Sequence, residues 1–429
     1  MSDGASAAPR LRGRRGRERR LATAQEVAAT RRAPRQATGT GAGQGAPGAG
    51  SGLRRPADLS PLPALLAASG ELRALVDRYR LVQGGRAGRD LRHVVYAAMP
   101  HGAKSYLAAA LARASGERLV WIARDAEIGD RVVEELVAWL GDPAEVVTLE
   151  PRTSLAYERS ELVRDEGAAR VAALATWCSG RPRVLVTSVQ ALFQRTLPPE
   201  ALPEQPLRLA PGQRLSQERL LRTLIELGYE PVPEVGGRGE FCRRGGIVDL
   251  FPAGQALPIR AEWFGDTLDS LRAFDPADQR GVNPVSEALV LPAGEILLPG
   301  ADAAERRQTL LARLGPLARR LPERLAADLE RLAESGQPSD TAEVWAGVLS
   351  PATGLDHLGP AIWVLDEPAD VDDAARALRA QADERAAELT EAGELPRGWP
   401  DAYLAPRDWK RALAAASTLE LGWEPETPG

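Results

Sequence analysis

The amino-acid sequence predicts an α/β protein in which a parallel sheet is interrupted by a small antiparallel α+β domain. Two observations predict this class. Short apolar segments alternate with helical patterns between residues 93 and 187, and such alternation is typical of βαβ units. From about Pro198 the pattern changes to short strands broken by glycines, which is typical of an antiparallel sheet.

The parallel part begins with a helical pair after Ser60 that leads into a first strand at residues 93–97. A helix carrying Leu107 and Leu111 follows that strand. Further strands are expected at 118–123, 145–149 and 183–187, and helices at 126–140 and 165–178. Strands joined by helices of this length form parallel sheets with right-handed crossovers.

The inserted part begins with a helix from Gln217 to Leu227 that ends at Gly228, a typical position for a glycine that stops a helix. Gly265 and Asp266 predict the turn of a hairpin. The strands are expected at 229–235, 240–243, 247–251, 258–264 and 268–274. Together these elements predict a small antiparallel α+β domain.

The remainder returns to the parallel fold. A helix is expected from Leu310 to Ala333, a buried strand ending in carboxylates at 363–367, and a long helix from Val371 to Leu389. No element is predicted after Tyr403. The resulting division is a tail at 1–57, the first part of the parallel domain at 58–197, the inserted domain at 198–300, and a helical, truncated second part at 301–429.

Composition excludes several classes of function. The chain has 429 residues with 44% hydrophobic content and a net charge of −5, so it is no general nucleic-acid binder. Its apolar runs are far below the roughly 20 residues of a membrane span, and a cytoplasmic protein is expected. The cysteines and histidines fit no zinc pattern. Cys178 falls in an apolar helical pattern with Val171 and Leu174, and we expect it in the core.

The tail at residues 1–57 is rich in arginine, then in glycine and alanine, without apolar periodicity. Such composition predicts disorder. It is interpreted either as a variable tail, or a start codon placed too early, or as an electrostatic arm for nucleic acid.

A degenerate phosphate loop follows the first strand. Residues Ala98 to Ser105 have the spacing of G-x-x-x-x-G-K-[ST], but alanine stands at both glycine positions, Ala98 and Ala103. Lys104 and Ser105 keep the charge and the hydroxyl. A Cβ at a position that needs positive φ costs roughly 1 kcal/mol or more and crowds a phosphate, so we expect common ancestry with the loop but no working loop.

Asp366 and Glu367 end a predicted strand, as the magnesium-binding partner of such a loop would. They are also compatible with an ordinary helix cap. We therefore expect no cofactor and no catalytic residue, with ATP and Mg²⁺ only if the degenerate loop at Lys104 and Ser105 still binds them.

The inserted segment resembles a known domain. It contains Gly228-Tyr229, Gly239-Glu240-Phe241, the run from Arg244 to Pro252, Pro258-Ile259-Arg260, the run from Glu262 to Asp266, and the run from Ser270 to Asp275. This ordered string resembles the UvrB interaction domain shared by UvrB and the transcription-repair coupling factor, and Leu291 to Glu295 favours the latter. The resemblance extends over roughly Val94 to Ala415 and implies a RecA-like fold that has lost ATPase function.

The resemblance implies UvrA as partner. Alternation along a strand places Arg260, Glu262 and Phe264 on one face of the inserted sheet and Ile259, Ala261 and Trp263 on the other. The partner-binding residues suggested by motif and alternation are Arg244, Phe251, Arg260, Glu262 and Phe264. Two residues depart from the family pattern: Glu230 and Cys242 stand where arginines are common. These departures put part of the arginine contacts in doubt.

These observations predict a truncated coupling-factor-like adaptor that docks UvrA in nucleotide excision repair. Its contact with damaged DNA would be indirect. RNA polymerase would be bound only by domains outside the region that resembles the family. One alternative is a nucleotide-binding UvrB-like repair ATPase. Another is a nucleic-acid binder that acts through the arginine-rich tail.

Overall fold

The computed structural model describes residues 59–83, 92–160, 163–202, 206–298, 300 and 302–423, without the side chains of 81–83. The expected disordered tail at residues 1–57 lies outside the described residues. Contacts divide the chain into residues 1–56 and 57–429, and the following concerns the second unit.

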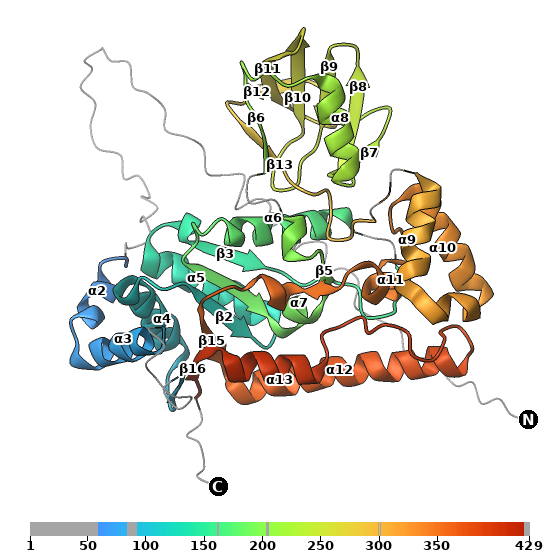
Figure 1. Ribbon diagram of the computed structural model, residues 1–429. Coiled ribbons are helices and arrows are strands. Elements are labelled where there is room, and N and C mark those ends of the chain that lie inside the picture. Colours follow the sequence, from blue (N-terminus) through green and yellow to red (C-terminus); the bar gives the residue numbers. More distant parts are fainter. Residues whose placement is uncertain are drawn as a thin grey trace, which may run out of the picture. The chain divides into compact units, whose positions relative to one another are not determined.

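A six-stranded parallel sheet forms the centre of this unit, as the alternating pattern predicts (Figure 1). Its strand order is β1-β16-β15-β2-β4-β3, and every pairing is parallel. The strands are β1 (His93–Tyr96), β2 (Leu119–Ala123), β3 (Val146–Leu149), β4 (Val184–Ser188), β15 (Ile362–Asp366) and β16 (Ser417–Leu421).

Helices cover both faces of the sheet, since residues of each buried strand point alternately to the two sides. Leu119 and Trp121 pack with α3, α4 and α5, whereas Val120 and Ile122 pack with α6, α7 and the later helices. The helices are α2 (Leu62–Ala67), α3 (Gly70–Gln83), α4 (His101–Ser115), α5 (Ala126–Leu140), α6 (Arg164–Cys178), α7 (Val189–Phe193), α9 (Ala303–Leu314), α10 (Glu323–Ser335), α11 (Ala342–Leu349), α12 (Pro368–Glu391) and α13 (Pro406–Ala415). Short 3₁₀ turns lie at 143–145, 199–201, 315–320 and 354–357, and strands β5 (Arg195–Thr196) and β14 (Ala352–Thr353) pair with each other.

Two elements lie after Tyr403, where the sequence predicts none. Helix α13 leads into β16, which lies between β1 and β15 in the sheet. Thr418 is buried and its carbonyl accepts a hydrogen bond from the Tyr79 hydroxyl at 2.8 Å. This strand was missed because only Leu419 and Leu421 mark it as apolar, and its partners lie far away in the sequence.

A second local expectation is wrong. Val171, Leu174 and Trp177 are buried on α6, but Cys178 is exposed at the end of that helix. The spacing placed it in the core because it stands seven residues after Val171 and four after Leu174. It is the last residue of α6, and helical spacing alone does not show whether other elements cover the end of a helix.

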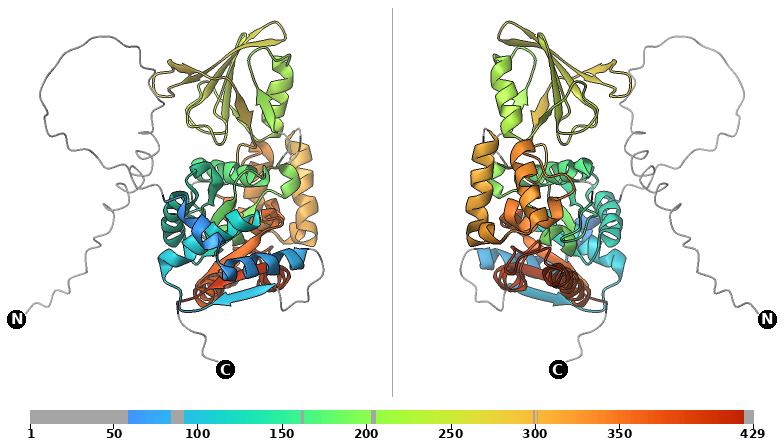
Figure 2. Two further views of the ribbon diagram at one scale, coloured as in Figure 1. Left: turned by 90° about the vertical axis from the view of Figure 1, so that its left-hand side faces the viewer. Right: turned by 90° about the vertical axis from the view of Figure 1, so that its right-hand side faces the viewer.

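The inserted domain is a six-stranded sheet with α8 (Gln217–Glu226) on one face (Figure 2). The order is β12-β11-β10-β9-β8-β7, with antiparallel pairings except between β7 and β8. Its strands are β7 (Glu230–Pro231), β8 (Glu240–Arg244), β9 (Ile247–Leu250), β10 (Ile259–Phe264), β11 (Thr267–Phe274) and β12 (Gly281–Pro284). The strand expected at 229–235 is thus only two residues long, since Pro231 and Pro233 lack the N–H that a longer ladder needs.

The two connections of the inserted domain pair with each other. Strand β6 (Leu207–Leu209) enters it and β13 (Ala288–Val290) leaves it, and they form an antiparallel pair. Directly after β13, the buried carboxylate of Glu295 accepts hydrogen bonds from Arg152 and from Arg170 Nε at 2.7 Å. Arg152 Nε donates to Glu343 at 2.7 Å. This buried network anchors the exit of the inserted domain to the parallel domain.

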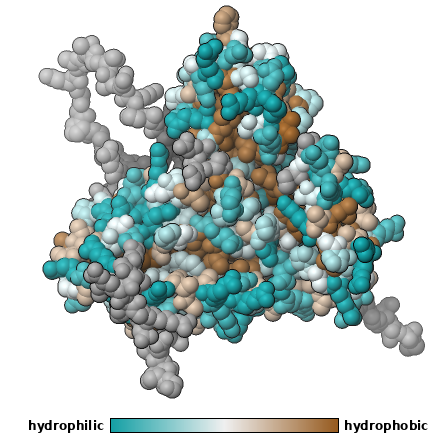
Figure 3. Space-filling view, in the orientation of Figure 1, coloured by the Kyte–Doolittle hydropathy of each residue, from teal (hydrophilic) through white to brown (hydrophobic). Residues whose placement is uncertain are grey.

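In the view of Figure 3 much of the surface is hydrophilic, with smaller hydrophobic areas among the hydrophilic residues. Among the described residues, every helix is too short or too polar to cross a membrane.

Candidate functional sites

The first candidate site is a cleft of about 1020 Å³ at the carboxyl ends of the parallel strands, which we call the strand-end cleft. Ligands of open α/β sheets bind at such ends. It is lined by residues after β1, β15 and β16 and by the start of α5, and its walls include His101, Asp366, Glu367 and Trp423.

The loop before α4 has the backbone bend of a phosphate loop, but most of the N–H groups that would bind a phosphate are not available. Ala98 has a φ of 56°, the left-handed conformation that glycine favours. The N–H of Met99 donates to the Gly422 carbonyl at 3.0 Å, Pro100 has no N–H, and those of Ala103 and Lys104 donate to the Pro100 carbonyl. Most of the amides that would surround a phosphate are therefore used within the chain.

Lys104 is fully buried and forms ion pairs inside the protein. Its Nζ lies 2.8 Å from Asp366 Oδ1 and 2.5 Å from Glu367 Oε1. Burial alone would raise the pKa of Glu367, but the hydrogen bonds from Lys104 and from the Trp423 N–H and the positive charge of Lys104 together hold that pKa below its usual value. The structure thus brings the three residues together as the sequence suggested, with the carboxylates in the position where a phosphate would be needed.

Ser105 is also committed to partners within the chain. Its Oγ donates to Glu135 Oε2 at 2.5 Å and accepts from Trp139 Nε1 at 3.1 Å. A magnesium-binding hydroxyl would have to give up these bonds. Glu135 and Trp139 could not be recognised from the sequence because nothing near Ser105 indicates that α5 lies against it.

The charge of the strand-end cleft is unfavourable to anions. Two guanidinium groups line it, Arg124 and Arg131, against six carboxylates: Asp125, Glu127, Asp366, Glu367, Asp370 and Glu420. Arg124 is itself paired with Asp125 at 3.0 Å and Asp370 at 3.2 Å. A nucleoside triphosphate would therefore meet a predominantly negative wall.

The second candidate site is the outer face of the inserted sheet, opposite α8. Alternation along β10 is as expected: Ile259 and Ala261 are buried beneath α8, while Arg260 and Glu262 point to the other side. Residues paired across strands share a face, so the register places Cys242, Asp249, Arg260 and Arg272 in one row and Arg244, Ile247, Glu262 and Ser270 in the next. We call these two rows, with Phe264 at the end of β10, the docking face.

The suggested partner-binding residues differ in how exposed they are and in the bonds they form within the chain. Arg260 forms a two-point ion pair with the buried Asp249, at 2.7 and 2.9 Å, and this raises the pKa of the guanidinium. Glu262 accepts a hydrogen bond from Ser270. The Arg244 side chain is 49% exposed and donates to the Pro233 carbonyl at 2.9 Å. Phe264 is 84% exposed, and is the most accessible of the set.

Phe251 lies on the same side of the sheet but is buried. It packs with Val235, Cys242 and Phe274 under the segment that follows β7, and the Arg238 guanidinium lies 4.8 Å from its ring centroid. Cys242 occupies the same small core and donates from Sγ to the Pro233 carbonyl. The cysteine at a position where arginine is common therefore serves packing, and the Phe251 side chain is not presented at the surface.

Glu230, the other departure, contacts the parallel domain. Its carboxylate forms an ion pair with Arg164 at 2.5 Å, and Arg238 pairs with Asp165 at 2.8 Å. These exposed pairs join the inserted domain to the start of α6. The sequence carries no sign of them, because the paired residues are 66 and 73 positions apart.

Comparison with known proteins decides what the inserted domain is. Residues 207–295 match the family model described as the UvrB interaction domain. That segment is therefore similar to a UvrB interaction domain. The resemblance seen in the sequence is confirmed, and the docking face is the outer face of this interaction domain.

Longer similarity connects the chain to two kinds of protein. It is 34% identical over 234 residues to a transcription-repair-coupling factor of Myxococcus xanthus, a match covering 52% of this chain and 19% of that protein. It is 25% identical over 325 residues to that of Bacillus subtilis, covering 71% and 27%. A UvrABC system protein B of Gloeobacter violaceus is 31% identical over 199 residues, covering 43% and 29%. The chain thus spans about a fifth to a quarter of the length of the coupling factors it matches.

Proposed function

We propose that this chain acts in nucleotide excision repair as an adaptor that docks onto UvrA through the docking face of its interaction domain. The observation that carries the proposal is the interaction domain itself, together with its similarity to coupling factors and to UvrABC system protein B. In this proposal damaged DNA is reached through UvrA, RNA polymerase would be engaged only by parts outside the matched region, and the setting is the cytoplasm.

The form of the docking face supports a specific contact. Phe264 offers a large exposed aromatic ring, and buried aromatic side chains are the commonest anchors of protein interfaces. Arg244 lies on the same sheet with half of its side chain exposed. Arg260 is already held by Asp249, so it enters a complex preorganised, with little side-chain entropy left to lose.

The test is capture of purified UvrA by the full chain, with two matched arginine variants. Arg244→Glu should weaken capture by reversing a charge on the docking face. Arg243→Glu is the control: its side chain is also 49% exposed, but it lies beside Glu218 of α8 on the opposite face. Equal capture by both variants would remove the docking face as the contact surface.

We further propose that the adaptor works without hydrolysing nucleotide. The internal pairing of Lys104, the reduced set of loop amides and the negative wall of the strand-end cleft support this. Equilibrium binding of labelled ATP with Mg²⁺ should show no saturable site at millimolar concentration. Tight binding that disappears in Lys104→Ala would instead establish the alternative, a nucleotide-binding repair ATPase.

A further inference from the structure

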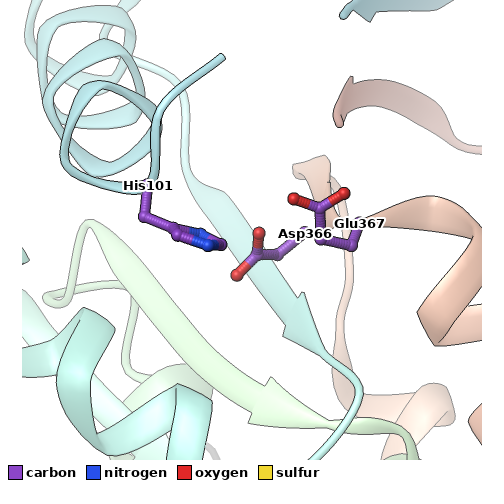
Figure 4. Close-up of side chains that lie close together, drawn as sticks. All are labelled: His101, Asp366 and Glu367. Atoms are coloured by element: carbon purple, nitrogen blue, oxygen red, sulfur yellow. The ribbon is translucent and has the colours of Figure 1, made fainter. Parts of the chain in front are cut away.

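One nitrogen donor and two oxygen donors meet in the strand-end cleft. A ring nitrogen of His101 and one carboxylate oxygen each of Asp366 and Glu367 lie within 4.8 Å of one another. Figure 4 shows the imidazole and the Asp366 carboxylate pointing toward each other, with the Glu367 carboxylate beside them. The three residues come from the start of α4, the end of β15 and the position before α12. Such a convergence of mixed donors is the usual ligand set of a divalent transition cation.

Part of this donor set is not used by the protein. Asp366 is only 5% exposed, and its Oδ1 accepts from Lys104. Within the described part of the chain no group donates to its Oδ2, and neither ring nitrogen of His101 makes a hydrogen bond. Asp366 lines the cleft and its Oδ2 is not one of the oxygens buried without a partner, so a cation can reach it from the cleft. Both Glu367 oxygens already accept a hydrogen bond from the Trp423 N–H.

The local charge also favours a cation. Lys104 offsets only one of the two negative charges of Asp366 and Glu367. The remaining charge faces a cleft in which six carboxylates outnumber two guanidinium groups. Walls of one sign concentrate the opposite charge in a cleft, and the feature that disfavours a nucleotide therefore attracts a metal ion.

We propose that His101, Asp366 and Glu367 bind a divalent transition cation of the zinc class. The imidazole selects such an ion over Mg²⁺, which prefers oxygen ligands only. Binding joins α4, β15 and α12 and stabilises the folded chain. The site lies in the parallel domain and is independent of UvrA docking, so failure of either proposal leaves the other standing.

The experiment is a titration of the full chain with Zn²⁺ in competition with a chromophoric chelator. His101→Ala should weaken Zn²⁺ binding by about tenfold or more, since even indirect partners of a metal ligand contribute that much. Cys178→Ser, which removes the exposed thiol, should leave Zn²⁺ binding unchanged. Glu127→Gln, which removes one carboxylate of the cleft outside the three ligands, should weaken binding much less than His101→Ala does.

Two further measurements separate this site from a phosphate-loop remnant. Lys104→Met should bind Zn²⁺ more tightly than the parent because a neighbouring positive charge is removed, whereas a nucleotide–metal site would be weakened. Mg²⁺ should compete poorly with Zn²⁺. Equal Zn²⁺ affinity of the parent and His101→Ala, or equal competition by Mg²⁺, would overturn the proposal, and the His101→Ala comparison decides alone if Lys104→Met does not fold.

Discussion

The strand-end cleft and the docking face differ in how far their basic side chains are buried and paired. In the cleft, Lys104 is buried and paired with Asp366 and Glu367. On the docking face, the Arg244 side chain is half exposed, and its Nη2 lies 3.9 Å from Oε2 of the exposed Glu234. A charge that is desolvated and paired within the chain supports the fold, whereas an exposed one contributes little to stability and remains available to a partner.

The same difference separates the loop before α4 from the interaction domain. The loop at Ala98 has the left-handed bend of a phosphate loop, but its lysine is paired within the chain. The interaction domain keeps an accessible aromatic side chain and an accessible arginine. If this comparison is correct, substitutions in the buried networks should lower stability, and those on the docking face should lower only UvrA binding.

The largest effect is expected from Glu295→Gln. The substitution leaves Arg152 and Arg170 buried without their shared carboxylate, and breaking a buried charge network costs about 3–5 kcal/mol. Urea denaturation measures the loss. Glu287→Gln, which removes the exposed partner of Arg208, is the control and should cost less than about 1 kcal/mol. A similar small loss for both would mean that burial does not separate the two kinds of pair.

A somewhat smaller loss is expected from Lys104→Met. It leaves Asp366 buried without its cation, but Glu367 is partly exposed and can be hydrated. We expect a loss on the order of 3 kcal/mol, measured by thermal or urea unfolding. The matched variant Arg244→Met on the docking face should leave the unfolding free energy almost unchanged. Unchanged stability in Lys104→Met would show that Lys104 is not committed to the fold.

On the docking face, Phe264→Ala should weaken UvrA capture by about 2 kcal/mol, or roughly 30-fold, because aromatic anchors dominate interface energies. The melting temperature should not fall, since the ring is 84% exposed. Val282→Ala removes another exposed hydrophobic side chain of the same sheet, on β12, and should bind as the parent does. A lowered melting temperature with unchanged capture would give Phe264 a structural role instead.

The smallest effect concerns Glu150, a partly buried carboxyl that lies beside a second carboxyl, Asp130. Burial, together with neighbouring Asp130, raises the pKa of Glu150 from 4.5 to about 7. The folded protein then holds this proton more tightly than the unfolded chain, so its stabilising effect is complete below pH 4.5 and is lost as the pH rises through 7. Glu150→Gln should therefore be more stable than the parent at pH 8, by on the order of 1 kcal/mol.

Unfolding of parent and Glu150→Gln at pH 5 and pH 8 provides the check for that effect. The advantage of the variant should shrink at pH 5, where the parent carboxyl is protonated in the folded state. A difference that is the same at both pH values would mean that the substitution acts through packing.

The sequence predicted the elements whose signals are local. The βαβ alternation, the hairpin at Gly265 and the faces of β10 follow from periodicity and turn chemistry over a few residues, and the structure confirms them. The weak strand β16 could not be predicted, because its burial depends on insertion between β1 and β15. The exposure of Cys178 was not predicted either, because helical periodicity does not show which residues at the end of a helix are covered.

By itself, the sequence determined the fold class, the interaction domain and the degenerate loop, since these rest on residue types at fixed short spacings. Only the tertiary structure decided what the charged residues do. It paired Lys104 with carboxylates 262 and 263 positions away, turned Ser105 to Glu135, and buried Phe251 while leaving Phe264 exposed. The physical reason is that desolvation and pairing depend on neighbours in space, and the folded chain alone brings those neighbours together.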